Sequence, residues 1–311
     1  MAGNGQTGDA MAGNGQTGDE KYPMRIKERV FKGILMWQCE AEEFETMETR
    51  EDDIWICTFP RSGTTMTQEL VYLIQTLDFE RADNTELDTR VLFLDCKDDR
   101  FPFYKGKKAI DEMKSPRLIK SHLHHFLLPE QLQNGKGRII YMFRNPKDVV
   151  ISLFKLFAWT RQLDEGENMF GRFFDSFVEG TAYACPWPKH VLGYWERKDD
   201  GHVLLLRYED VIKDMPAAIR RIAKFLGRTL TDENVANIAD HCNIVNMRNN
   251  DKVNLSYWKN IGYVNFEENE SQFINKGHPG TWHEKLSPEQ AAKMDKLIRE
   301  VEDAGLQIVQ T

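Results

Sequence analysis

The stretch TFPRSGTT at residues 58–65 combines side chains and backbone features suited to binding an anion, and it follows the apolar run IWIC. A strand that turns through a glycine into a helix presents several backbone N–H groups to one anion. Arg61 adds a cation, and Thr64 and Thr65 add hydroxyl donors. The usual nucleotide signature, G-x-x-x-x-G-K-[ST], is absent, so the identity of the anion stays open. A capped strand–turn–helix without any ligand is the alternative.

A second anion site is indicated by RNPKDVVISLF at residues 144–154. Arg144 ends a predicted strand, Pro146 begins a helix, and Ser152 lies two turns into it. An arginine beside a helix N-terminus suits a phosphate group. Pairing of Arg144 with a nearby carboxylate is the alternative.

A proton-transfer pair is indicated by KSHLHHF. Lys120 and His122 lie two positions apart on a predicted strand, so their side chains point to the same side. A cation beside an imidazole suits proton transfer next to a developing negative charge. A purely structural histidine is the alternative. A metal held by His122, His124 and His125 is not expected, because no further type of ligand lies nearby.

A fourth stretch, FINKGHPGTW at residues 273–282, holds a basic, flexible turn at Lys276 and Gly277. By itself it would be a solvated loop. It becomes part of a binding site only if the fold places it beside the other three stretches.

The elements that must position these residues follow an α/β pattern, in which short apolar runs alternate with helical patterns. Such runs predict a parallel sheet covered on both faces, with ligands bound beyond the carboxyl ends of its strands. A long irregular loop is predicted over residues 242–286. Strands are predicted over 54–59, 117–122 and 138–144 and from 202, and helices over 64–76, 146–157, 216–227, 231–241 and 287–305.

Composition narrows the classes of function. The 311 residues include 41 Lys+Arg against 49 Asp+Glu, for a net charge of −8. Nucleic-acid binding is not expected of so acidic a chain. No apolar run approaches the length of a membrane span, and the N-terminus lacks a secretory signal. Five cysteines without a C-x-x-C suggest reduced thiols, so we expect a cytoplasmic protein.

The chain divides into two unequal parts. Residues 1–20 repeat a Gly-, Asn- and Gln-rich unit with nothing to bury, so we expect a disordered, tag-like segment. Met11 is then a candidate natural start. Residues 21–311 are expected to form a single domain.

Together the four stretches, with RYEDV at residues 207–211, resemble in order and spacing the cytosolic sulfotransferase family. The resemblance runs from about residue 50 to 285. The form PRSGTTMTQELV is similar to insect members, including the insect retinol dehydratase. The resemblance implies a P-loop-like α/β fold with a central parallel sheet flanked by helices. It also implies transfer of a sulfuryl group from 3′-phosphoadenosine 5′-phosphosulfate (PAPS) to a hydroxyl of a small apolar or phenolic acceptor, leaving adenosine 3′,5′-bisphosphate (PAP).

The resemblance also assigns roles to residues. His122 matches the catalytic base, and Lys120 and Arg61 match cations that stabilise the oxygen bridging phosphate and sulfate. The first loop would hold the 5′-phosphate and the sulfate, and Tyr208 matches a residue lining the nucleotide. The remaining cofactor-binding residues implied are Ser62, Gly63, Thr64, Thr65 and Met66 in the first segment, Arg144, Ser152, Asn275, Lys276 and Gly277 at the 3′-phosphate, and Cys242 and Asn243 at the adenosine.

Several positions depart from the family pattern. Arg61 stands where the family usually has Lys, and its planar fork differs from a point charge. Met66 replaces a Trp and Ile244 a Phe at the adenine, which weakens stacking. Asn275 replaces an Arg at the 3′-phosphate. The family's dimer motif, K-x-x-x-T-V-x-x-x-E, is poorly matched by HEKLSPEQAA at residues 283–292, so a homodimer stays open.

Other functions remain open. A P-loop-like nucleotide kinase would need a Walker lysine and a magnesium-binding aspartate, and neither stands at the expected place. A catalytically silent nucleotide- or ligand-binding protein is compatible with Met66, Ile244 and Asn275, but has no use for a base at His122. Dehydration of an allylic alcohol such as retinol, through a sulfated intermediate, would use the same residues. No metal is expected, because side chains supply the cations.

Overall fold

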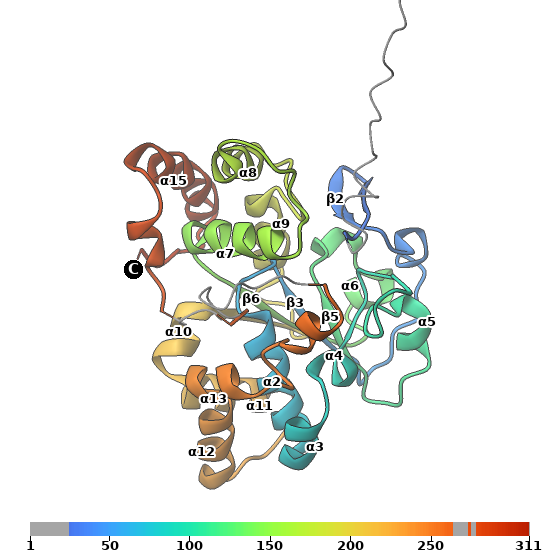
Figure 1. Ribbon diagram of the computed structural model, residues 1–311. Coiled ribbons are helices and arrows are strands. Elements are labelled where there is room, and N and C mark those ends of the chain that lie inside the picture. The colour runs from blue at the N-terminus through green and yellow to red at the C-terminus, as the bar shows by residue number, and fades with distance from the viewer. Residues whose placement is uncertain (1–24, 264–272, 275–277, 311) are drawn as a thin grey trace, which may run out of the picture.

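The computed structural model describes residues 25–263, 273–274 and 278–310. Its centre is a five-stranded sheet with the order β4-β5-β3-β6-β7 (Figure 1). All neighbouring strands in it are parallel, as the sequence predicted. The bounds are β3 Ile54–Thr58, β4 Leu92–Phe93, β5 Leu118–Ser121, β6 Arg138–Phe143 and β7 Val203–Arg207. A separate antiparallel hairpin, β1 Glu28–Phe31 and β2 Ile34–Trp37, was not predicted.

The register of the strands aligns their carboxyl ends. Cys57 of β3 lies opposite Ser121 of β5, and Thr58 opposite Met142 of β6. On the other side of β6, Phe143 lies opposite Arg207 of β7. The residues that follow these strands therefore meet at one rim of the sheet, where parallel α/β sheets bind their ligands.

Two layers of helices cover the sheet (Figure 1). One layer includes α2 Thr64–Thr76, α11 Met215–Phe225 and α12 Asp232–His241; the other includes α7 Pro146–Trp159, α8 Met169–Val178, α9 Trp187–Trp195 and α15 Pro288–Asp303. The predicted helices are confirmed, and Ser287 caps α15 through the expected capping box with Gln290. Helices α8 and α9 were not predicted. The shorter helices are α3 Phe79–Asn84, α4 Leu87–Arg90, α5 Gly106–Asp111, α6 Glu130–Gln133 and α10 Tyr208–Lys213, with 3₁₀ turns η1 Ala41–Glu43 and η2 His125–Leu127.

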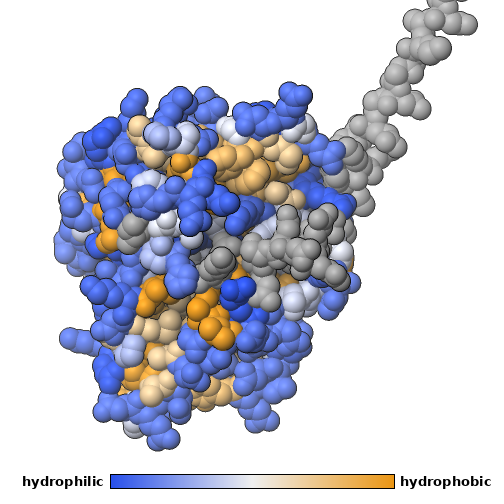
Figure 2. Space-filling model, turned by 60° about the vertical axis from the view of Figure 1, so that its left-hand side comes forward, coloured by the Kyte–Doolittle hydropathy of each residue, from blue (hydrophilic) through white to orange (hydrophobic). Residues whose placement is uncertain are grey.

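The strands are buried on both faces because their side chains alternate between two cores. Ile54 and Ile56 of β3 pack with the apolar residues of α2, α11 and α12. Trp55 and Cys57 point the other way, into the core shared with α7, α8, α9 and α15. This double coverage is why β3 is apolar along its whole length. The outer surface drawn in Figure 2 is mostly hydrophilic.

The prediction of one irregular loop over residues 242–286 is wrong in part. The described residues of this stretch include α13 Ile244–Asn249, α14 Tyr257–Asn260 and the 3₁₀ turn η3 Thr281–Glu284. Asn243 caps α13 by accepting from the Asn246 N–H, and Trp258 of α14 stacks on Phe103 at 5.7 Å. Short capped turns held by tertiary packing leave no helical periodicity in the sequence.

Candidate active site

A cavity opens at the carboxyl-end rim of the sheet. It brings together most of the residues predicted as a site, namely Arg61, Gly63, Thr64, Thr65, Met66, Lys120, His122, Arg144, Ser152, Tyr208 and Cys242. Ser62 and Asn243 are not in its lining: Ser62 is fully buried beneath the loop, and Asn243 caps α13. Asn275, Lys276 and Gly277 lie outside the described residues.

The loop between β3 and α2 is built for close approach of an anion. Gly63 has φ of +100°, and a Cβ there would lie 2.7 Å from the Tyr208 ring and 2.8 Å from the Met142 sulfur, so only glycine fits. Gly63 is also the N-cap of α2, and it has no side chain to bond the first amides. The Oγ of Ser62 has no hydrogen-bond partner among the described residues. These unpaired donors suit a phosphate or sulfate.

His122 follows β5 and lines the cavity with Lys120, as predicted. Its Nδ1 lies 2.9 Å from the Thr58 carbonyl oxygen. A carbonyl only accepts, so Nδ1 carries the proton and Nε2 is the basic nitrogen. Burial, then the charge of Lys120, lowers the pKa of His122 to about 3. The imidazole is therefore neutral near pH 7, with Nε2 unprotonated.

Lys120 presents its ammonium 4.2 Å from the centre of the Phe93 ring. Burial lowers the pKa of Lys120, while the charges of Asp88 and Asp95 oppose that effect. Beneath the pair, the Asp95 carboxylate accepts from the His122 backbone N–H and from the Ser121 hydroxyl. The sequence did not predict a role for Asp95, because a single aspartate after an apolar run belongs to no recognisable motif.

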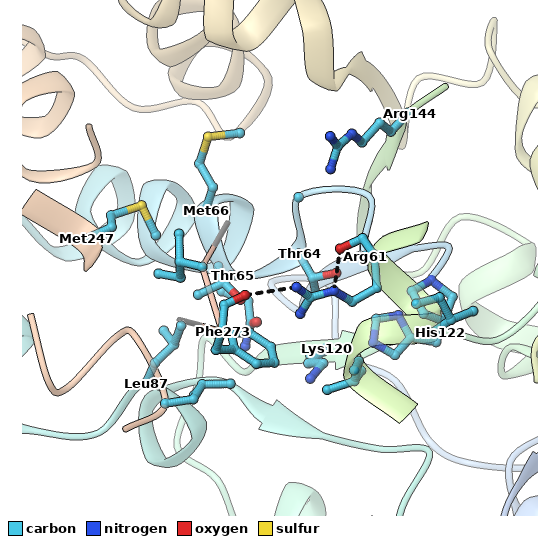
Figure 3. Close-up of a pocket in the computed structure, with 18 of the residues that line it drawn as sticks. Arg61, Thr64, Thr65, Met66, Leu87, Lys120, His122, Arg144, Met247 and Phe273 are labelled. Carbon is cyan, nitrogen blue, oxygen red and sulfur yellow. Dashed lines mark hydrogen bonds between the residues drawn. The ribbon is translucent and has the colours of Figure 1, made fainter. Parts of the chain in front are cut away.

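Arg61 crosses the cavity instead of pointing outward (Figure 3). Its Nε donates to Ser152 Oγ at 2.9 Å, and a terminal nitrogen donates to the Phe273 carbonyl at 2.9 Å. The guanidinium also lies 4.3 Å from the centre of the Phe273 ring. Burial, then the charge of Arg144, lowers the pKa of Arg61 to about 9. The predicted residues of the two anion sites are thus in direct contact.

Arg144, at the end of β6, is 8% exposed. Its guanidinium lies 4.5 Å from the centre of the Tyr208 ring, and its Nε has no hydrogen-bond partner among the described residues. A terminal nitrogen lies 3.4 Å from Asp148 Oδ2, so the carboxylate pairing that the sequence left open exists. Asp148 also accepts from Gly280 N at 2.9 Å and from the Thr281 hydroxyl at 2.9 Å. It thereby ties α7 to the segment that follows Lys276 and Gly277.

The cavity has two apolar parts, and only the first includes residues that the sequence predicted. Met66 and Cys242 are joined by Ile212, Ile244 and Met247, and Figure 3 shows Met66 and Met247 together on the side away from His122. An aromatic wall is formed by Trp37, Tyr104, Tyr183 and Phe157, whose ring centres lie 5.1 to 5.8 Å apart in successive contacts. Trp37 comes from the hairpin, Tyr104 and Tyr183 from loops and Phe157 from α7, so no single periodic pattern reveals the wall.

Two features are absent from the part of the chain that the structure describes. No group of three or more His, Cys, Asp or Glu among the described residues could hold a metal ion. None of the described helices has the length and apolar character needed to cross a bilayer. The absence of a metal from the reaction stays a prediction. All five cysteines are buried and free.

A parallel sheet with an anion-binding loop after its central strand defines the P-loop-like α/β class. Within that class, residues 51–304 match the family model described as the sulfotransferase domain. The chain is 33% identical to the amine sulfotransferase of Oryctolagus cuniculus over 285 residues, covering 90% of each protein. It is 32% identical to sulfotransferase 1E1 of Homo sapiens over 268 residues, covering 85% of this chain and 89% of that protein.

Solved structures agree with this match. A crystal structure of retinol dehydratase in complex with androsterone and the inactive cofactor PAP aligns with a TM-score of 0.81, 29% identity and 90% coverage of each chain. Mouse sulfotransferase SULT7A1 in complex with PAP aligns with a TM-score of 0.68 and 26% identity, covering 88% of this chain and 94% of that one. The chain belongs to the cytosolic sulfotransferase family and is a sulfotransferase.

Proposed function

We propose that the protein transfers the sulfuryl group of PAPS to a hydroxyl of a small, apolar or phenolic acceptor. One observation carries the proposal: two sets of unpaired anion-binding donors and a neutral imidazole line or underlie one cavity. The donors are the loop amides and the Ser62 hydroxyl at the start of α2, and the Nε of Arg144, which follows β6 and whose terminal nitrogen also lies 3.4 Å from Asp148. The imidazole is that of His122.

The residues present fit the nucleotide. The loop from Ser62 to Thr65 would hold the 5′-phosphate and sulfate, and Arg144 the 3′-phosphate, with Ser152 and the turn at Lys276 beside it. Tyr208, Met66 and Cys242 would line the nucleoside, and Ile244 and Met247 extend that apolar surface. Asn243 would act through its cap of α13. PAPS supplies the activated sulfuryl group.

The chain's own residues then promote the transfer. His122 Nε2 takes the proton of the acceptor hydroxyl, a contribution typically worth roughly 10²–10⁴-fold. Lys120 and the loop amides stabilise negative charge on the leaving oxygen, and each such donor is typically worth about 10²–10³-fold. Arg61 joins them once its bonds to Ser152 and the Phe273 carbonyl are exchanged for bonds to the nucleotide.

A second outcome is favoured by one observation, the alignment with retinol dehydratase in complex with retinol and PAP, at a TM-score of 0.81 and 29% identity. Dehydration of an allylic alcohol after sulfation would use the same base and cations, so the acceptor alone distinguishes the two outcomes. The buried free thiols support a reducing, cytoplasmic setting for either. We also propose, from the likeness of PRSGTTMTQELV to insect members of the family, that the protein is of the insect type.

The proposal is tested by His122→Ala, with His124→Ala as the matched control. His124 is also buried, but it bonds the Ala184 carbonyl and is outside the cavity lining. We expect His122→Ala to lower turnover of a phenol by roughly 10²–10⁴-fold. The thermal shift produced by PAP should persist, because the base contacts the acceptor and not the adenosine. A parallel loss of turnover and of the PAP shift would remove His122 from the catalytic role.

A further inference from the structure

The cavity has one acidic side chain among the described residues that line it, Asp88 of α4. It is 4% exposed and shares the cavity with Lys120 and His122. Carboxylates are rarely buried without a partner, because removal from water penalises their charge. The proposed transfer gives Asp88 no role, so its place in the cavity needs another explanation.

Both hydrogen bonds to Asp88 end on the same oxygen. Oδ2 accepts from the Tyr257 hydroxyl and, at 3.3 Å, from the indole N–H of Trp258. Oδ1 receives no hydrogen bond from the described residues. The two donors hold the carboxylate in place and are both neutral, so they leave its charge uncancelled. An acceptor in this state that lines a cavity favours a ligand that brings a donor to it.

Asp88 lines the same cavity as Lys120, the proposed catalytic cation. Its charge acts on Lys120, where it opposes the lowering of the pKa by burial. The other charged residues lining the cavity are Arg61 and Arg144, and the proposed nucleotide would neutralise both. With the nucleotide bound, Lys120 and Asp88 are the charged residues left among the described residues of the lining, and no ion pair joins them. A positively charged or hydroxyl-bearing end of an acceptor is then favoured near Asp88.

The rest of this side is apolar. The ring of Trp258 lies 6.4 Å from that of Tyr104, centre to centre, and Tyr104 lies 5.8 Å from Trp37. The aromatic wall therefore continues to the residue that holds Asp88. Such a surface fits an aromatic or alicyclic body, and Asp88 is a single polar point on it.

We propose that Asp88 is a specificity-determining residue of the acceptor site. It selects acceptors that carry, besides the hydroxyl to be sulfated, a second hydrogen-bond donor, either a hydroxyl or an ammonium group, on an aromatic or alicyclic body. An acceptor with a purely hydrocarbon end leaves Oδ1 unpaired in a dry site and is disfavoured. This inference rests on the proposed function.

The first test uses the wild-type protein and phenols with a para chain of increasing length that ends in methyl, hydroxyl or amine. We expect kcat/KM of the best donor-ended phenol to exceed that of its methyl-ended match by roughly 10- to 100-fold. The same order is expected in the thermal shift that each phenol adds to PAP-saturated protein. Equal values at every chain length in both measurements would overturn the proposal.

Two variants of Asp88 distinguish the preference for a hydroxyl end from the preference for an amine end. Asp88→Leu should bring both ratios close to one, whereas Asp88→Asn, whose amide oxygen still accepts, should keep part of the hydroxyl preference and lose the amine preference. Glu86→Gln is the control, because Glu86 lies two residues away, pairs with Lys252 and is outside the cavity lining. Ratios that stay at the wild-type value in Asp88→Leu would overturn the proposal.

Failure of this inference differs from failure of the proposed function. In one case, PAP shifts the unfolding temperature and phenols are sulfated, while the ratios of donor-ended to methyl-ended phenols are the same in wild type and Asp88→Leu. That result would contradict this inference alone. If PAP produces no shift and no phenol is sulfated, the proposed function falls and this inference with it. The PAP shift also reports whether each variant is folded.

Discussion

The base and the carboxyl beneath it have pKa values moved in opposite directions by burial. The pKa of His122 falls to about 3, so its own protonation does not limit its action as a base near neutrality. The pKa of Asp95 rises to about 7, mainly through burial, although hydrogen bonds from His122 and Ser121 oppose that rise. Asp95 is thus the group near the base that changes charge in the physiological range.

We predict that turnover rises as pH increases through about 7, where Asp95 loses its proton. The negative charge then supports the imidazolium that forms when His122 accepts a proton. Asp95→Asn, which cannot ionise, should lose this step and turn over more slowly at high pH. The measurement is the pH profile of kcat, with the exposed Asp99→Asn as control. Persistence of the step in Asp95→Asn would show that another group causes it.

Among elements, the parallel strands are tied together by a buried ion pair at the end of the sheet away from the cavity. Asp53 precedes β3 and Arg117 precedes β5. Arg117 Nε donates to Asp53 Oδ1 at 2.7 Å, and a terminal nitrogen donates to Oδ2. Both side chains are almost fully buried, at 2% and 0% exposed, so neither charge has water as an alternative partner.

We predict that Asp53→Ala lowers the free energy of unfolding by about 3–5 kcal/mol, because it removes both carboxylate bonds of the buried Arg117 and leaves, among the described residues, only Asp111, at 3.6 Å, facing its charge. Denaturant unfolding measures the change. Glu45→Ala, which breaks the exposed pair with Lys32, is the control and should leave the midpoint almost unchanged. PAP affinity of the folded Asp53→Ala protein should remain normal. A loss confined to PAP affinity would contradict a purely structural role for the pair.

The elements that the sequence predicted are those whose signal is local. The apolar runs of β3, β5, β6 and β7 and the capped helices α2, α7, α11, α12 and α15 agree with the structure to within a few residues. The hairpin β1–β2, the helices α8 and α9, and the short turns α13 and α14 were missed. Their formation depends on packing against the rest of the chain, as with Trp258 against Phe103.

Over the whole molecule, the cavity joins segments from α2, β5, α7 and α13 and Arg144, which follows β6, so a ligand that bridges them should stabilise the global fold. PAP at a hundredfold excess over its Kd adds about 2.7 kcal/mol to the free energy of unfolding. Part of that gain depends on the 3′-phosphate, which we assign to Arg144.

We predict that Arg144→Ala reduces the rise in Tm produced by PAP and leaves the rise produced by adenosine 5′-monophosphate nearly unchanged. A hydrogen bond to a charged group contributes about 1.5–3 kcal/mol, and only PAP has the 3′-phosphate that would receive it. Arg138→Ala is the control, because Arg138 lies at the other end of β6 and bonds the Leu226 carbonyl. Equal losses for both nucleotides would contradict the 3′-phosphate assignment.

By itself, the sequence determined the parallel sheet, the glycine turn after β3 and the Lys120–His122 pair, because each depends on residues that are close together in the chain. It also determined the family, because several short motifs occur in a fixed order and spacing. Only the tertiary structure decided that Arg61 contacts Ser152, that Asp95 accepts from the His122 backbone, and that Asp88 lines the same cavity as His122. Those relations join residues from separate segments. Burial and distance, which create their pKa shifts and unpaired oxygens, exist only after the chain has folded.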